Sequence, residues 1–142
     1  MTTLKAGTGL SRAQDAADAG REAAEKAMAA LGREAPALVV VYAAPRYDLP
    51  ALLAAIRSAT GDAPLVGATG SGEMVDGQYL GFGAGVAVLV LSAGPYSFGL
   101  ASAGRIKGDL DRAGQELARQ SRAQARPGAH SAVLLLADSL LG

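Results

Sequence analysis

The chain has 142 residues, half of them hydrophobic, which is the length and composition of one domain with a core of its own. Thirteen basic side chains balance thirteen acidic ones, so no long-range charge attracts nucleic acid or an anionic membrane surface. The absence of cysteine excludes disulfides, thiol nucleophiles and thiolate metal sites, and the sequence shows neither a signal peptide nor a membrane-spanning run, so we expect a cytoplasmic protein.

The first predicted element is a helix over residues 11–31. Residues 7–10 form a flexible or short extended lead-in, and Ser11 and Gln14 have the spacing of a capping box, which satisfies free amides at a helix start. Alanines recur at helical spacing along one face, and Gly32 is a natural stop. An alanine face lets this helix lie close to a sheet, and we expect it to cover one.

A β-α-β unit follows the first helix. Residues 37–43 are apolar on both alternating faces, which is typical of a central strand covered on both sides. Asp48 is placed to cap a helix over residues 49–60, which ends at Gly61, and residues 65–68 form a second buried strand. Such a connection is right-handed and joins parallel strands.

The remaining pattern predicts a hairpin, a helix and a last strand. Residues 81–92 read as a long strand, and residues 96–101 as its antiparallel return, which makes the sheet mixed. Asp109 is placed to cap a helix over residues 109–125 with Leu110, Ala113, Gly114, Leu117 and Ala118 inward, and residues 131–137 form a final strand. The predicted fold class is therefore α/β: a mixed, mainly buried sheet with helices packed on its faces.

The sequence ends directly after the last predicted strand, with no helix to close the layer. We interpret residues 1–142 as a single domain that is the N-terminal portion of a longer protein. A helix face made of alanines and an open-ended strand also favour a homodimer, in which a second copy covers the free edge.

A glycine-rich turn follows the strand at residues 65–68, and we interpret it as the centre of a binding site. Loops at the carboxyl ends of parallel strands are where α/β proteins hold ligands. Glycines can adopt positive φ and bring backbone amides close to a bound group, with the nearby hydroxyls assisting. The alternative is a tight connection without a ligand. The spacing matches neither a dinucleotide fingerprint nor a phosphate-binding Walker loop. The turn residues proposed to bind are Gly67, Thr69, Gly70, Ser71, Gly72 and Glu73.

Charged residues in the neighbouring loops complete the predicted site. If strands 37–43, 65–68 and 131–137 are parallel, their exit loops meet at one edge of the sheet. There Arg46 would clamp a carboxylate, and Glu73 or Asp138 would receive an ammonium group. The alternatives are a solvated Arg46 or its ion pair with Asp48, a surface carboxylate for Glu73, and contacts of Asp138 with a missing C-terminal half.

No constellation of catalytic residues emerges from the sequence. Ser71 or Ser139 with His130 and an aspartate would be the one hydrolytic combination, and the Gly-x-Ser-x-Gly nucleophile motif does not occur. His130 is the single histidine, which argues against a multi-histidine metal centre. We therefore expect a protein that is not an enzyme and that holds no metal.

The succession of Leu38-Val39-Val40-Val41-Tyr42, a helix, Leu65 to Met74, and Asp76-Gly77 before a Val/Leu-rich strand resembles the FIST N domain. The likeness runs from about residue 8 to residue 142. In that family the turn reads like Gly-Cys-Thr-Thr-Ala-Gly-Glu-Ile, and Gly67, Thr69, Gly72 and Glu73 take matching positions, with Ala68 in place of the cysteine. The closing stretch, residues 134–139, is also similar to the family pattern of a hydrophobic run followed by aspartate.

The resemblance implies a sensory module for signal transduction. FIST N domains are followed by a FIST C domain or accompany signalling output domains, and small ligands such as amino acids have been proposed for them. Some members are described as haem-dependent nitric-oxide sensors, which here would require His130 and a large apolar pocket in a chain with few aromatic residues. Our leading expectation is a non-enzymatic small-ligand sensor without a resident cofactor. A haem sensor and a ligand-free assembly module are the alternatives.

Overall fold

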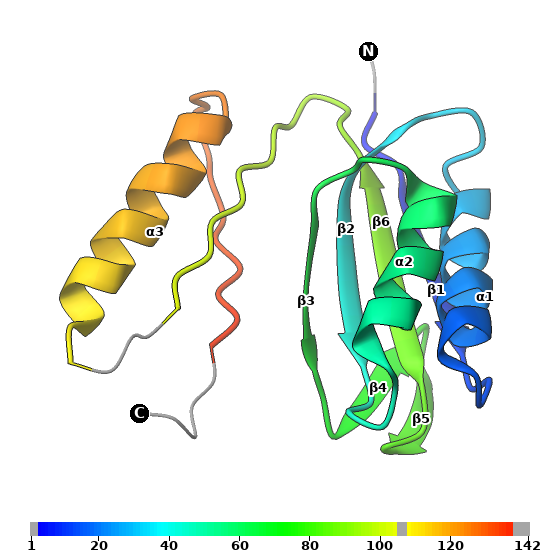
Figure 1. Cartoon of the computed structure of the whole chain (residues 1–142). Helices are drawn as coiled ribbons and strands as arrows, with labels where there is room; N and C mark the ends of the chain where they lie inside the picture. The colour runs from blue at the N-terminus through cyan, green and yellow to red at the C-terminus, as the bar shows by residue number, and fades with distance from the viewer. Residues whose placement is uncertain (1–2, 105–107, 138–142) are drawn as a thin grey trace. The chain divides into compact units, whose positions relative to one another are not determined.

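The computed structural model of the chain describes residues 3–104 and 108–137. They belong to two compact units, Met1–Tyr96 and Ser97–Gly142, which are described separately (Figure 1). No helix of the described part combines the length and the apolar character needed to cross a membrane.

The first unit is an α/β unit with a mixed sheet. Its elements in chain order are β1 (Ala6–Ser11), α1 (Ala16–Ala29), β2 (Pro36–Ala43), α2 (Leu49–Thr60), β3 (Leu65–Thr69), β4 (Gly72–Val75), β5 (Gln78–Phe82) and β6 (Val86–Ser92). Four strands form the main sheet in the order β1-β6-β2-β3, and β4 and β5 form a separate hairpin. β2 and β3 are parallel, as the β-α-β prediction requires, whereas β6 is antiparallel to both of its neighbours.

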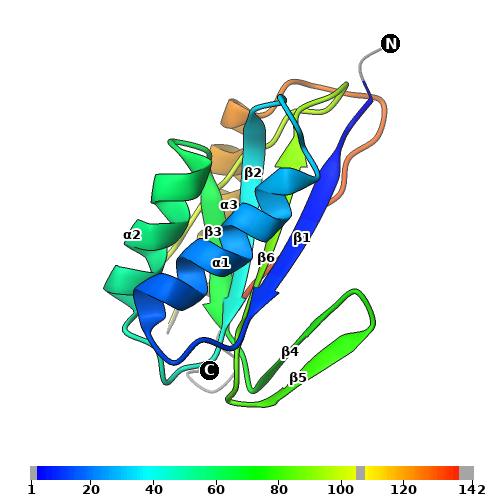
Figure 2. The same ribbon diagram turned by 90° about the vertical axis from the view of Figure 1, so that its right-hand side faces the viewer.

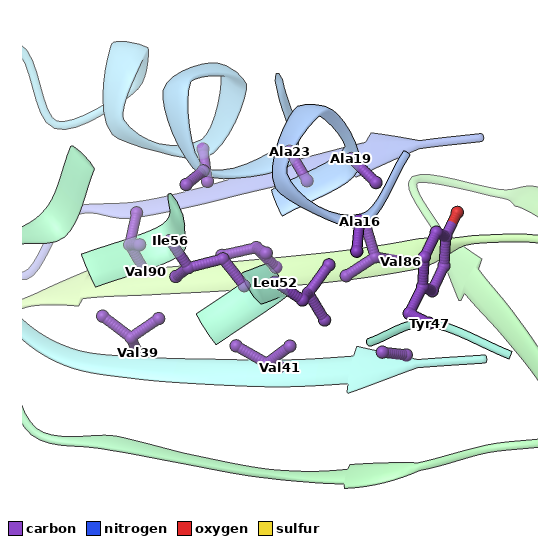
Figure 3. Packing of buried hydrophobic residues seen from close by; sticks show 14 of the residues in the cluster. Ala16, Ala19, Ala23, Val39, Val41, Tyr47, Leu52, Ile56, Val86 and Val90 are labelled. Carbon is purple, nitrogen blue, oxygen red and sulfur yellow. The ribbon is translucent and has the colours of Figure 1, made fainter. Parts of the chain in front are cut away.

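Both helices of this unit lie on the same face of the main sheet (Figures 1 and 2). Figure 3 shows Leu52 and Ile56 of α2 against valines of β2 and β6, and both side chains are fully buried. The alternation of β6 sends Val86, Val88 and Val90 to this face. Within the unit, therefore, helices cover one face of the sheet, and the expectation that helices cover both faces of strand 37–43 is not met there.

Helix α1 lies unusually close to the edge strand β1. Its alanines at 16, 19, 23, 24 and 27 are buried, and all of them except Ala19 belong to the helical face that the sequence predicted. A Cβ on Gly7 or Gly9 would overlap a carbonyl oxygen of α1, of Ala27 and Ala23 respectively. Glycine on the strand and alanine on the helix are thus both required, because any larger pair would push the helix away from the sheet.

The predicted beginning of the first helix is wrong. Residues 6–11 form β1, and the helix starts at Ala16 with Asp15 as its N-cap, whose side chain accepts from the Asp18 amide at 2.9 Å. Ser11 ends the strand opposite Val86, and its hydroxyl donates to Glu22 at 2.7 Å. The capping-box pattern predicted the wrong structure because the backbone of residues 6–11 forms its hydrogen bonds with β6. A backbone paired in a sheet cannot at the same time begin a helix. The predicted α2 is correct, although Asp48 makes no side-chain capping bond.

The predicted long strand over residues 81–92 is also wrong, because two glycines break it. Gly81 and Gly83 have φ of 95° and 63°, values that disrupt an extended strand. The chain turns there, so that β5 pairs with β4 while β6 enters the main sheet. The predicted return strand over residues 96–101 does not form, and β1 takes the place beside β6.

The second unit contains α3 (Leu110–Gln124) and two extended segments. Asp109 caps α3 as predicted, accepting from the Arg112 amide at 2.9 Å. The C-terminal half of α3 contacts residues 97–100: Leu100 exchanges two hydrogen bonds with the Gln124 side chain, at 3.2 and 2.6 Å.

Two predictions for the second unit are wrong. No residue of α3 is buried, so the inward face expected for it is not formed. Residues 131–137 do not form a strand, and Val133, Leu134 and Leu135 are exposed. A segment becomes a strand only where another strand pairs with its backbone. The apolar composition of residues 131–137 favours a strand but does not provide a strand for them to pair with.

Candidate functional site

The carboxyl ends of three strands form one row at an edge of the main sheet. Ser11 of β1 and Ala43 of β2 both lie opposite Val86, and Ala43 also lies opposite Thr69 of β3. Because β1 and β2 are each antiparallel to β6, the strands β1, β2 and β3 run in the same direction. Their exit loops meet beside the β4–β5 hairpin (Figure 2).

We call this place the carboxyl edge, and it comprises residues 11–15, 44–48, 69–73 and 83–85. The sequence predicted two of its three exit loops correctly. The third does not come from the segment at residues 131–137, which is not a strand, but from the loop after β1. Sequence reasoning missed that loop because Ser11 was assigned to a helix.

Arg46 is the most connected side chain of the carboxyl edge. Its Nε donates to the Gly83 carbonyl at 3.1 Å, and its Nη1 donates to Gln14 Oε1 at 3.1 Å. Its Nη2 donates to Tyr47 Oη at 2.7 Å and to the Ala13 carbonyl at 3.3 Å. Among the described residues it makes no ion pair with Asp48, the partner considered from the sequence.

These bonds give Arg46 a positioning role. All three guanidinium nitrogens already donate to protein acceptors, so a ligand carboxylate would have to displace them. The acceptors belong to three segments: the loop after β1, the loop after β2 and the turn before β6. Arg46 therefore holds these three segments, which form the rim of the carboxyl edge, together. The sequence had suggested that it would instead clamp a ligand carboxylate.

Tyr47 supports the same rim from inside. Its ring is 5% exposed, and its hydroxyl donates to the Ala13 carbonyl at 2.8 Å. Burial raises the pKa of the Tyr47 phenol, which the Arg46 cation opposes and the Glu73 and Glu22 carboxylates reinforce. The sequence pattern that could have indicated the contact between Arg46 and Tyr47 is an aromatic residue directly after an arginine in a strand-exit loop.

The glycines of the turn serve close packing. None of Gly67, Gly70 and Gly72 has positive φ, the property that suggested an amide cradle. Gly67 lies within β3, where a Cβ would overlap the Val41 carbonyl oxygen, and a Cβ on Gly72 would come within 2.7 Å of the Tyr79 ring. The Gly70 amide donates to the Ala43 carbonyl at 3.0 Å.

The hydroxyls of the turn remain available. Thr69 and Ser71 are both exposed, and neither hydroxyl forms a hydrogen bond with another of the residues that the structure describes. The Ser71 carbonyl accepts from the Gly83 amide at 3.1 Å, which ties the turn to the start of β6. The turn is thus fixed by its backbone, while its two hydroxyl side chains are free to contact a ligand.

Glu73 is the chemically distinctive residue of the site. It lies in β4 and is only 3% exposed, so the alternative of a surface carboxylate is wrong. Within the described part of the chain, no group donates a hydrogen bond to its Oε1 or Oε2. Burial raises the pKa of the Glu73 carboxyl, and the nearby amides of Glu73 and Gly85 act in the opposite direction. Buried carboxylates are normally paired, so this exception marks a candidate functional group.

Asp138, like Ser139, lies outside the described residues. His130 belongs to the second unit and is exposed there.

Two hollows on the surface of the described residues are lined by residues outside the carboxyl edge. The smaller, about 170 Å³, lies between α1 and α2, and its lining residues are Arg21, Glu25, Ala55, Ser58 and Ala59. The larger, about 530 Å³, is lined by Arg112, Gln115, Glu116 and Arg119, all from α3. Arg119 and Gln120 hold the pKa of Glu116 down to about 2, so the carboxylate of that hollow is already paired with Arg119. Four residues of one helix do not enclose a ligand, and we do not assign a site there.

The fold and the carboxyl edge define an α/β protein whose loops gather at the ends of parallel strands, the position at which this class binds ligands. The sequence model of the FIST N domain family matches residues 37–142, more than half of the chain. The chain belongs to this family, as the resemblance of its turn predicted, and the family is one of sensory domains associated with signal transduction. None of the curated proteins compared with the sequence matches it.

Proposed function

We propose that this chain is a non-enzymatic intracellular sensory domain that binds a small polar ligand at the carboxyl edge. Membership of the FIST N family supports the sensory role. The convergence of three strand-exit loops supports this location for the ligand. Arg46 joins two of these loops and the turn before β6, and a rigid rim loses little entropy when a ligand binds.

The single observation that carries the proposal is the Glu73 carboxyl. It is buried at this edge without a protein hydrogen-bond donor, and such a group lowers the stability of the fold. Residues that break the rules of stable packing concentrate at functional sites. The exposed hydroxyls of Thr69 and Ser71, in the turn that leads to Glu73, supply further ligand contacts.

We propose that the signal passes to a FIST C domain or to a signalling output domain, and that the protein acts in the cytoplasm. The first expectation comes from the family resemblance, and the second from a sequence with neither a signal peptide nor a membrane-spanning run. A homodimer is a further way to transmit binding at this edge, and light scattering with and without ligand tests it. A monomer under both conditions would contradict the homodimer.

A thermal-shift screen of the chain against free amino acids, simple amines, small carboxylates and haem tests the proposed function. A ligand at a hundred times its dissociation constant adds about 2.7 kcal/mol to the free energy of unfolding, which moves the midpoint by several degrees. Ser71→Leu places bulk on the turn and should abolish the shift. Ser58→Leu, in the hollow between α1 and α2, is the matched control and should retain it.

Each outcome of the screen has a distinct meaning. A selective shift lost in Ser71→Leu supports binding at the carboxyl edge. A shift lost in Ser58→Leu instead would move the site to the hollow between the helices. No shift with any compound would contradict the proposed function for this chain. A haem Soret band lost in His130→Ala would favour the haem sensor in its place.

The β4–β5 hairpin favours a second candidate function, an assembly module. Met74, Tyr79 and Phe82 are 75%, 57% and 83% exposed, and large apolar side chains at this exposure commonly mark interaction surfaces. Met74→Ser with Phe82→Ser should then change the oligomeric state in light scattering and leave ligand binding intact. An unchanged oligomeric state would contradict this candidate.

A further inference from the structure

We propose that the ligand presents a compact cation, a protonated primary amine, to the Glu73 carboxylate, and that its binding favours the ionised form of Glu73. The inference deepens the proposed function and rests on it. It names the group that the carboxyl edge recognises and makes recognition dependent on pH.

The first argument is the charge around Glu73. Strand β4 contacts β1, β2, β5 and β6, and the titratable side chains on those four strands are Tyr42 and Tyr79 alone. The adjoining loops add charged and titratable groups, which are Arg12, Asp15, Arg46, Tyr47, Asp48 and Asp76. No cationic group of the protein is among the causes of the Glu73 pKa shift. A positive partner for the ionised form of Glu73 would therefore come from the ligand.

The second argument is the role of the nearest arginine. Arg46 donates through Nε, Nη1 and Nη2 to acceptors of the rim. It is therefore not aimed at Glu73, nor is it free to neutralise an anion. A ligand carboxylate would meet an occupied guanidinium and a neighbouring carboxyl group of like charge. The edge thus favours a cation over an anion.

The third argument is steric. A Cβ on Gly70 would lie 3.1 Å from Glu73 Oε1, so the backbone of the turn approaches the carboxylate directly. Gly70 and Gly72 carry no side chains, and Ser71 between them carries only a hydroxymethyl group. This approach suits a small head group such as an ammonium. An ammonium carries three N–H donors, and the carboxylate of Glu73 and the hydroxyls of Thr69 and Ser71, close together along the chain, are oxygen acceptors.

The release of a proton follows from these surroundings. Burial favours the neutral form of the Glu73 carboxyl, whereas an ammonium in contact with it favours the ionised form. The incoming amine is already protonated, so the proton lost from Glu73 passes to the solvent and one charge pair is formed. Below the Glu73 pKa of the free protein, affinity should therefore increase with pH, by up to about tenfold per pH unit.

The test uses the whole chain and a matched pair of probes, ethylamine and propionate. Isothermal titration calorimetry between about pH 5 and about pH 8, in buffers of different ionisation enthalpy, reports affinity and proton release together. We expect ethylamine to bind with release of up to one proton and propionate not to bind. Glu73→Gln should weaken ethylamine at least tenfold and abolish the proton release.

Glu25→Gln is the control, because it removes the same charge from an exposed position of α1 and should change neither quantity. Preference for propionate, no binding of ethylamine at any pH, or equal ethylamine binding by Glu73→Gln would each overturn the inference. In all three cases a ligand found in the thermal-shift screen would leave the proposed function standing. Failure of the whole screen would overturn both.

Discussion

The Arg46 guanidinium covers the ring of its neighbour Tyr47, with Cζ 4.1 Å from the ring centroid, and donates to the Tyr47 hydroxyl at 2.7 Å. The same hydroxyl donates to the Ala13 carbonyl at 2.8 Å. Two adjacent residues therefore join the loop after β2 to the loop after β1. This pair prepares the carboxyl edge before any ligand arrives.

Arg46→Lys should lower the free energy of unfolding by about 1–2 kcal/mol, because lysine keeps the charge but loses the planar fork that reaches several acceptors. Urea unfolding of the whole chain measures the change. Arg21→Lys is the control, since among the described residues Arg21 pairs only with Asp18, on the exposed side of α1. This variant should change stability by less than about 0.5 kcal/mol. Equal effects of the two variants would contradict the role given to Arg46.

Glu73→Gln should raise the free energy of unfolding at about pH 8 by ~1–3 kcal/mol, because it removes a buried charge without donors. The Glu73 pKa is raised in the folded state, so the cost is present above that pKa and disappears as the pH falls toward 4.5, its unperturbed value. The wild type should thus approach the variant in stability on acidification. Urea midpoints at several pH values measure this. A difference that stays constant with pH would show that charge is not its cause.

Gly9→Ala should lower the free energy of unfolding by about 2 kcal/mol or more, because the added Cβ overlaps the Ala23 carbonyl and lies 2.8 Å from the Ala27 amide nitrogen. Gly114→Ala is the opposite case: among the described residues no atom outside the surrounding helix backbone lies within 4 Å of the added Cβ, and alanine favours the helix by ~0.5–1 kcal/mol. Thermal unfolding compares the two. A tolerated Gly9→Ala would contradict the close packing of α1 on β1.

Backbone amides of α3 should exchange with deuterium faster than those of β2. Helix α3 has no buried residue, whereas Val39, Val40 and Val41 of β2 are all buried in the first unit. Hydrogen exchange followed by mass spectrometry measures both segments in one sample. Equal protection of the α3 and β2 amides from exchange would contradict this expectation and would indicate that another surface covers α3 in solution.

The sequence alone was sufficient where the signals are local. Helix α2 follows from a proline in its first turn and ends at Gly61, which has a φ of 65°, and α3 follows from the Asp109 cap. The parallel pairing of β2 and β3 follows from the short helical connection between them. The glycine-rich turn was correctly placed at the exit of β3, and its pattern led to the correct family.

Tertiary structure decided everything that depends on competition between distant segments. Residues 6–11 pair with β6 although residues 96–101 are nearer along the chain, and residues 131–137 pair with no strand although they are rich in valine and leucine. The burial of Glu73 and the acceptors of Arg46 likewise depend on β1 and on the turn at residues 83–85. Caps and periodicity act within a few residues, whereas backbone pairing and burial are shared among all segments that reach the same place. For this reason the sequence predicted which residues reach the carboxyl edge from two of its loops, and only the fold determined which of them is left without a partner.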